Sequence, residues 1–180
     1  MSIFRRLYRW LGAHDGMTHI VAGNPAPNFS LQSLEGRQFS LAESLKKGPV
    51  VLAFFKVSCP VCKFTFPFLE RLFQRYGKDD ATFLAVSQDN LGASRDFAKE
   101  LGLTFPVLTD AAGYPVSNAY GLTMVPTVFL LESAGAVRVS SMGFVRADLE
   151  SIADSLADRQ NLTRVPVFAA SESVPDVKPG

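Results

Sequence analysis

The sequence predicts an α/β protein, a three-layer α/β/α sandwich in which helices cover both faces of a central mixed β-sheet. Residues 50–55 are six consecutive apolar residues, and residues 82–87 form a second, mainly apolar run. Such runs are typical of strands that are buried on both faces in a mainly parallel sheet. Residues 127–131 and 136–142 are separated by a short turn, so we expect two antiparallel neighbours. The sheet should therefore contain both parallel and antiparallel strands.

The remaining elements follow from periodicity and from the turn residues between the segments. Residues 29–39 predict two short strands around a turn at Glu35-Gly36, which would form an N-terminal β-hairpin extension. Gly77 is expected to cap the helix that follows the first buried strand. The expected helices cover residues 41–47, 61–76, 93–101, 116–120 and 146–157, and residues 105–110 form a further strand-like segment.

The length and charge of the chain limit its organisation and its partners. A chain of 180 residues fits one domain, assigned to residues 23–160, with an extension at each end. Residues 1–22 are assigned to an N-terminal amphipathic helix and linker, and residues 161–180 to an irregular C-terminal tail. The formal net charge of +1 argues against a broad basic surface, so nucleic acid is not an expected partner.

Residues 2–11 are basic and amphipathic, with apolar side chains on one side of a helical wheel and three arginines on the other. This pattern fits a helix on a membrane surface, but it is more typical of a helix packed on its own domain or on a second copy of the chain. The start of the sequence lacks the apolar core of a secretory signal, and no later segment approaches the roughly 18 uninterrupted apolar residues of a membrane span. We therefore expect a cytoplasmic protein, with peripheral membrane association as an open alternative.

The only two cysteines are Cys59 and Cys62, which directly follow the first buried strand and precede a predicted helix. Unpaired N–H groups and the helix dipole at a helix N-terminus favour a thiolate over a thiol at Cys59. This arrangement suits disulfide exchange, in which Cys59 attacks a disulfide and Cys62 resolves the mixed disulfide. The redox-active Cys59–Cys62 disulfide would then serve in place of a cofactor. Lys56 could stabilise the thiolate, or it could be a solvated loop lysine.

The cysteine pair has two other interpretations, a zinc site and an inert buried pair. A zinc site would need about two further ligands, and the only histidines, His14 and His19, lie near the N-terminus outside any ligand pattern. No metal is therefore expected. The cysteines could also be an inert buried pair, because free cysteine packs well in protein cores.

Several spaced features resemble the thioredoxin-like superfamily. Pro67 lies five residues after Cys62, at the position of the helix kink in that superfamily, and residues 121–127 look like its cis-proline loop. Residues 142–144 look like its glycine loop. The resemblance implies a thioredoxin-like redox domain with a cis peptide bond before Pro126.

The resemblance also implies a substrate-binding surface around the cysteine pair. Val125 would offer backbone hydrogen bonds to an extended substrate, and Pro126, Pro60 and Gly143 would lie beside it. Residues 26–41 and 105–110 look more specifically like the AhpC/TSA redoxin and TlpA-like branch, so that the resemblance covers about residues 24–158.

The chain also departs from these families at positions close to the cysteines. Ser58 stands where a tryptophan commonly precedes the cysteine pair, and Ala53 and Thr65 stand where related proteins carry an acid. Glu70 is eight residues beyond Cys62, roughly 12 Å along a helix. We therefore expect no obvious base for Cys62 and a slow or water-mediated resolving step.

These observations predict a thiol-disulfide oxidoreductase that acts on protein or small-molecule disulfides and is recycled by a thiol reductant. The first alternative is a peroxiredoxin-like thiol peroxidase. The peroxiredoxin signature places Thr three and Pro seven residues before the reactive cysteine, whereas Lys56 and Leu52 occupy these positions before Cys59. The second alternative is a redox-inert binding module. The Pro60-Val61 pair between the cysteines carries no charge, which favours a reducing or intermediate potential.

Overall fold

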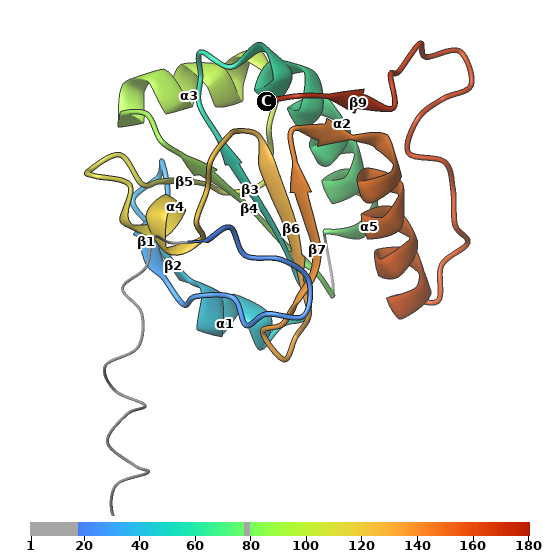
Figure 1. The fold of residues 1–180 in the computed structure, drawn as a ribbon, viewed down its shortest axis with the longest axis horizontal. Helices are drawn as coiled ribbons and strands as arrows, with labels where there is room; N and C mark the ends of the chain where they lie inside the picture. Colours follow the sequence, from blue (N-terminus) through green and yellow to red (C-terminus); the bar gives the residue numbers. More distant parts are fainter. Residues whose placement is uncertain (1–17, 78–79) are drawn as a thin grey trace, which may run out of the picture.

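A computed structural model of the chain describes residues 18–77 and 80–180. Its centre is a five-stranded mixed sheet with the strand order β5-β4-β3-β6-β7 (Figure 1). The three strands β3, β4 and β5 are parallel, whereas β6 is antiparallel to β3 and β7 is antiparallel to β6. The bounds are Val50–Phe55 for β3, Thr82–Ser87 for β4, Val107–Thr109 for β5, Thr127–Leu131 for β6 and Val137–Met142 for β7.

Helices cover both faces of this sheet, which confirms the predicted three-layer sandwich. The helices α2 (Pro60–Tyr76), α3 (Leu91–Glu100) and α5 (Arg146–Arg159) contribute to the core on one face. On the other face lie α1 (Leu41–Leu45) and α4 (Pro115–Ala119). The expected helix over residues 2–11 lies outside the described residues.

The central strand β3 connects the two cores. All six of its residues are buried: Val51 and Phe55 face the core under α2, while Leu52 and Phe54 face the opposite core. Alternate residues of a strand point to opposite faces, so a strand buried on both sides has no polar alternation. This burial explains the uninterrupted apolar run and fixes the position of the loop that follows β3.

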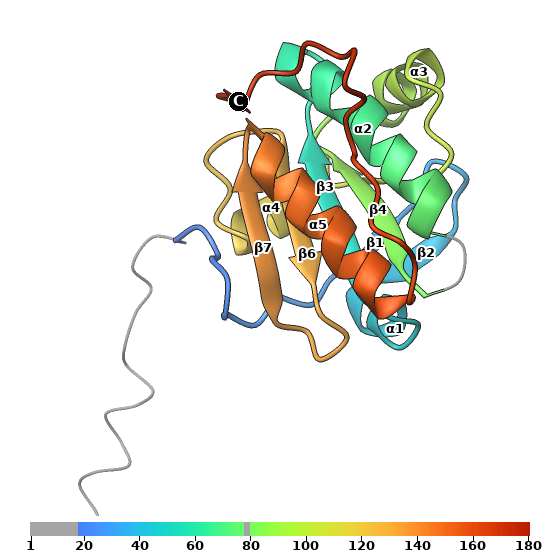
Figure 2. The same ribbon diagram turned by 90° about the vertical axis from the view of Figure 1, so that its right-hand side faces the viewer.

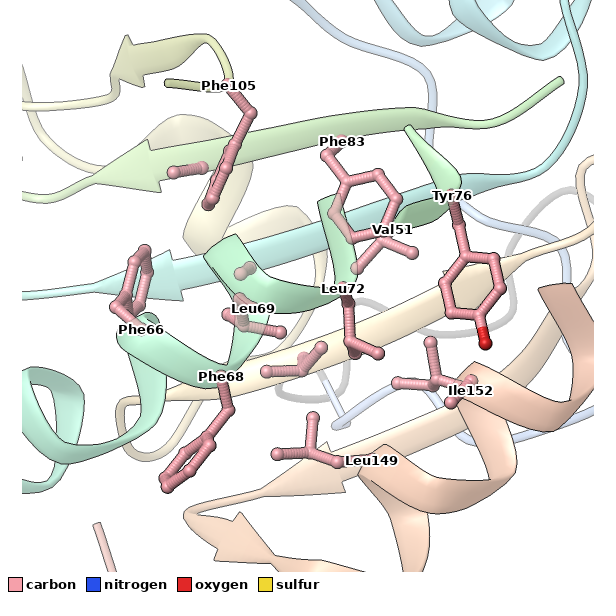
Figure 3. Close-up of a cluster of buried hydrophobic side chains, with 14 of the residues drawn as sticks. Val51, Phe66, Phe68, Leu69, Leu72, Tyr76, Phe83, Phe105, Leu149 and Ile152 are labelled. Atoms are coloured by element: carbon pink, nitrogen blue, oxygen red, sulfur yellow. The ribbon is translucent and has the colours of Figure 1, made fainter. Parts of the chain in front are cut away.

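The core over the α2 face is a dense layer of aliphatic and aromatic side chains. Figure 3 shows Leu69 and Leu72 of α2 beside Leu149 and Ile152 of α5, over Val51 of the sheet. This layer holds α2 against β3 along most of its length. The position of its first turn is therefore set by packing as well as by the connecting loop.

The predicted N-terminal hairpin is present. Strand β1 (Ser30–Gln32) pairs with β2 (Gln38–Ser40) in an antiparallel two-stranded sheet. Gly36 in its turn has a φ of 86°, a backbone conformation that glycine adopts without the strain of a side chain.

The C-terminal tail is more ordered than an irregular segment. Its residues Val167 and Phe168 are buried in the core between α2 and α5. Further along, β9 (Val177–Lys178) pairs with β8 (Phe144–Val145) in a second antiparallel two-stranded sheet. Figure 2 shows the tail running along the helix layer between α2 and α5 before it reaches the end of the sheet. A two-residue strand is too short to show the alternation of polar and apolar residues, so the sequence does not predict this pairing.

An ion pair ties the tail to α2. The Arg71 guanidinium donates to both carboxylate oxygens of Glu172, at 2.9 and 2.7 Å. This interaction and the Ala169 N–H lower the pKa of Glu172 to about 2. A carboxylate whose pKa is lower in the folded than in the unfolded chain stabilises the fold at a pH above its unfolded pKa. This contribution is lost as the pH falls toward the pKa of the folded state.

We expect Glu172→Gln to lower the melting temperature at pH 7 by a small amount, because partly exposed ion pairs contribute little. The difference from the parent should shrink between about pH 4.5 and pH 2, where Glu172 itself becomes neutral. Thermal unfolding at several pH values tests this expectation. Glu43→Gln, which removes the exposed pair with Lys46, is the matched control. If the difference in melting temperature between the variant and the parent stays constant down to pH 2, the substitution acts through packing instead.

Within the described residues, none of the helices combines the length and the apolar character that crossing a membrane would require.

Candidate active site

Cys59 is placed by the junction between β3 and α2. Strand β3 ends at Phe55, and after three connecting residues Cys59 is the N-cap of α2, with Pro60 in the first turn. The Cys59 sulfur accepts a hydrogen bond from the Cys62 backbone N–H at 3.1 Å. A sulfur in this position accepts one of the N–H groups that the first turn of a helix leaves unpaired.

The two cysteines differ in exposure. Cys59 is half-buried, whereas Cys62 has 0% of its surface exposed, and both are free thiols. Burial raises the pKa of the Cys62 thiol far above its usual range. The hydrogen bond with the Cys59 side chain, the charge of Cys59 and the charge of Asp89 raise it further, against an opposing backbone hydrogen bond from Lys56. Cys59 is thus the accessible sulfur, and Cys62 is held inside as a neutral thiol.

The loop before β6 meets the cysteine pair as the sequence predicts. The Val125–Pro126 peptide bond is cis, and the Cys59 thiol donates to the Val125 carbonyl at 3.3 Å. The Gly143 N–H donates to the Pro126 carbonyl at 2.8 Å, which joins the glycine loop to the same place. Residues far apart in the sequence therefore converge around Cys59.

Lys56, which the sequence suggests as a partner for the Cys59 thiolate, lies beside an aromatic ring. Its ammonium lies over the ring of Tyr114, 5.5 Å from the ring centroid. Tyr114 precedes α4 and has a left-handed backbone conformation with a φ of 55°. The Lys56 side chain thus has an aromatic partner on the loop that leads into α4.

Asp89 is a site residue that the sequence interpretation missed. One of its carboxylate oxygens accepts a hydrogen bond from the Val57 N–H at 2.7 Å, so it fixes the loop that leads into Cys59. Its charge also acts on Cys62. A signal was available, because Asp89 follows β4, the parallel neighbour of β3, and the carboxyl ends of such strands meet at one edge of the sheet.

Thr65 and Glu70, both on α2, make hydrogen bonds to partners other than Cys62. Thr65 is buried and its hydroxyl donates to the Val61 carbonyl at 2.7 Å, so it contributes no acid. The Glu70 carboxylate accepts hydrogen bonds from the backbone and the side chain of Thr104, at 2.9 and 2.5 Å. Glu70 therefore braces the loop after α3.

Comparison with known proteins agrees with this geometry. The sequence model of the AhpC/TSA family matches residues 22–140. This chain belongs to the AhpC/TSA family. Among its relatives in the curated proteins is the thiol-disulfide oxidoreductase ResA of Geobacillus thermodenitrificans (strain NG80-2), which is 35% identical over 142 residues, covering 75% of this chain and 80% of the relative. ResA of Bacillus subtilis (strain 168) is 32% identical over 126 residues, covering 68% of each chain.

A solved structure with the same fold is the thiol:disulfide interchange protein, a thioredoxin family protein, of Chlorobium tepidum TLS. It superimposes with a TM-score of 0.63 and 27% sequence identity, covering 74% of this chain and 95% of that structure. This AhpC/TSA-family chain is a thiol-disulfide oxidoreductase with a thioredoxin-like fold.

Among residues 18–77 and 80–180, no group of three or more His, Cys, Asp or Glu side chains is placed to hold a metal ion. His19 shares a 2.7 Å hydrogen bond with the Ser140 hydroxyl and stacks on Phe129.

Proposed function

We propose that the protein reduces disulfides through a two-step exchange in which Cys59 attacks and Cys62 resolves. The Cys59 thiolate attacks one sulfur of the substrate disulfide, and the other substrate sulfur leaves as a thiolate. Cys62 then gives up its proton and attacks Cys59, which releases the second substrate thiol and leaves the Cys59–Cys62 disulfide. Two electrons have passed to the substrate, so a thiol reductant must restore the pair.

The contrast between the two sulfurs carries this proposal. The half-buried Cys59 sulfur lies at the start of α2 and accepts the Cys62 N–H, whereas Cys62 is fully buried. Exchange requires a thiolate that a substrate can reach, and only Cys59 combines access with a backbone donor. The pair itself carries the electrons, so the proposed reaction uses no cofactor.

Formation of the mixed disulfide also prepares the second step. The side-chain hydrogen bond and the charge of Cys59 are among the causes that raise the pKa of Cys62. The charge disappears and the hydrogen bond weakens when Cys59 is bonded to the substrate, because a neutral disulfide sulfur is only a weak acceptor. Cys62 therefore becomes a better nucleophile at the moment when it is needed.

Two assays run side by side test the function. We expect the protein to accelerate the reduction of insulin by dithiothreitol and to leave the rate of hydrogen peroxide consumption at background. Peroxide consumption without insulin reduction would instead indicate a thiol peroxidase. Activity in neither assay would indicate a redox-inert binding module and would reject the proposal.

The resolving step should respond to Asp89. Asp89→Asn keeps an oxygen that can accept the Val57 N–H but removes a negative charge that raises the pKa of Cys62. We expect the mixed disulfide to resolve a few-fold faster near pH 7, because a larger fraction of Cys62 is ionised. Quenched-flow measurement of the mixed disulfide against pH tests this expectation, with Asp96→Asn on the exposed side of α3 as a control. Slower resolution at every pH would show that Asp89 is a base for Cys62.

A further inference from the structure

The last residues of the described chain lie across the candidate active site. Strand β9 adds to the edge of β8, with Phe144 opposite Lys178 and Val145 opposite Val177. The Arg146 N–H donates to the Asp176 carbonyl at 2.8 Å, which extends the pairing by one residue. Figure 1 shows this segment passing the first turn of α2 and ending at the marked C-terminus, near the carboxyl end of β3. We call residues 176–180 the C-terminal strap.

The strap contacts the backbone beside the reactive cysteine. Gly180 packs so closely on the Val125 carbonyl that a Cβ at position 180 would overlap its oxygen. The same carbonyl oxygen lies 3.3 Å from the Cys59 sulfur. A Cβ at Gly143 would lie 2.6 Å from the Lys178 carbonyl oxygen and 3.0 Å from the Gly180 nitrogen. The strap backbone therefore fills the space between the cis-proline loop and the glycine loop.

A side chain of the strap covers α2 as well. The Lys178 ammonium lies over the ring of Phe64, 5.1 Å from its centroid. Phe64 follows Cys62 by two residues, and its ring packs edge-on against Phe144 at 4.9 Å. A cation over an aromatic face contributes about 0.5–1 kcal/mol at an exposed site. This contact holds the strap across the helix without burying it deeply.

The strap is attached firmly at one end and weakly at the other. Before it, Phe168 is buried in the core and Glu172 is paired with Arg71. Within it, Val177 is 58% exposed and Gly180 is also exposed. Segments with little buried apolar surface open at low free-energy cost, so the strap can leave while the preceding residues stay in place.

An extended polypeptide substrate would need the groups that the strap occupies. Extended peptides bind by adding a strand to a free sheet edge, where backbone hydrogen bonds supply the affinity. The edge of β8 and the Val125 carbonyl could bind a substrate backbone in this way. Strand β9 already pairs with β8, and Gly180 already contacts the Val125 carbonyl. A compact disulfide needs only a path to the half-buried Cys59 sulfur.

We propose that the C-terminal strap occupies the place of an extended substrate backbone, and that it must move before a polypeptide disulfide, but not a small disulfide, can react with Cys59. This inference rests on the proposed function for its account of the substrate. The reactive site is thereby biased toward compact disulfides while the strap is docked. If the open form is about a tenth of the population, the strap lowers reactivity toward extended partners about tenfold.

A truncation of residues 176–180 tests the size dependence directly. Cys59 is alkylated with iodoacetamide, a small reagent, and with maleimide attached to polyethylene glycol, a bulky one. We expect truncation to raise the rate with the bulky reagent about tenfold and to change the rate with the small one by less than about twofold. Equal acceleration of both reagents, or of neither, would overturn the inference. Near-ultraviolet circular dichroism establishes whether the truncated chain keeps its packing.

A point variant answers the same question in the full chain. Lys178→Ala removes the contact with Phe64, and the matched control Lys47→Ala removes an exposed lysine that follows α1. Lys178→Ala should raise the bulky-reagent rate selectively, whereas Lys47→Ala should not. A Lys178→Ala protein that behaves like the control would count against the strap, even if the truncated chain does not fold.

Substrate assays separate this inference from the proposed function. With the strap removed, insulin reduction should accelerate relative to reduction of the small disulfide hydroxyethyl disulfide. Equal acceleration, or none, in a protein that reduces both disulfides would reject the strap and leave the proposed function intact. Alkylation of Cys59 does not require disulfide exchange. If truncation accelerates only the bulky reagent in a protein that reduces neither disulfide, the strap covers Cys59 but the proposed function is rejected.

Discussion

Cys59→Ser is expected to abolish disulfide reduction. A serine hydroxyl is not ionised at neutral pH and does not displace a thiolate from a disulfide, so the first step has no nucleophile. The loss should reach the assay background, on the order of a thousandfold or more, as expected when a covalent nucleophile is removed. The insulin assay measures it.

The fold should tolerate this substitution. Cys59 is the N-cap of α2, where its sulfur accepts the Cys62 N–H, and serine is among the preferred N-cap residues. The melting temperature of Cys59→Ser should therefore remain close to that of the parent. Retained turnover in a folded Cys59→Ser protein would show that Cys59 is not the nucleophile.

Cys62→Ser is expected to stop the reaction at the mixed disulfide. Attack by Cys59 should continue within a few-fold of the parent rate, because the accessible sulfur and its helix position remain. The second step loses its nucleophile, so about one substrate should stay bound to each protein in the absence of added thiol. Non-reducing electrophoresis and mass spectrometry detect this adduct, and a reductant should release it.

A control is needed because Cys62 is fully buried. A buried hydroxyl without a good partner costs about 1–3 kcal/mol, so Cys62→Ser could lose stability for reasons unrelated to chemistry. Cys62→Ala removes the thiol without adding a polar group and should trap the same adduct. Rapid turnover in both variants would exclude Cys62 as the resolving residue.

Most of the framework around the cysteines follows from local sequence. The apolar run of β3 predicts a strand buried on both faces, and the adjoining cysteine pair predicts a helix start at the same edge of the sheet. The cis bond before Pro126 and the position of Gly143 came from the resemblance to thioredoxin-like proteins, and the structure confirms the bond and the convergence. Each of these features is encoded in a short segment, so the residues of that segment are enough to predict it.

The missed features depend on contacts between distant segments. Asp89 reaches Val57 because β4 lies beside β3 in register, with Ser87 opposite Phe55, and its position directly after a buried strand is the only local sign of this contact. Strand β9 has two residues and pairs through its backbone, so its side chains do not specify its partner. Lys56 could be placed over Tyr114 only once the loop before α4 was known.

Cys59 and Cys62 are expected to interconvert between a dithiol and an intramolecular disulfide. This interconversion can be measured by equilibrating the protein with glutathione buffers of graded ratio, followed by acid quenching and peptide mass spectrometry. We expect one reversible two-electron transition in which the peptides containing Cys59 and Cys62 become joined. Cysteines that remain separate thiols across the whole range, or that oxidise only as glutathione adducts, would contradict it.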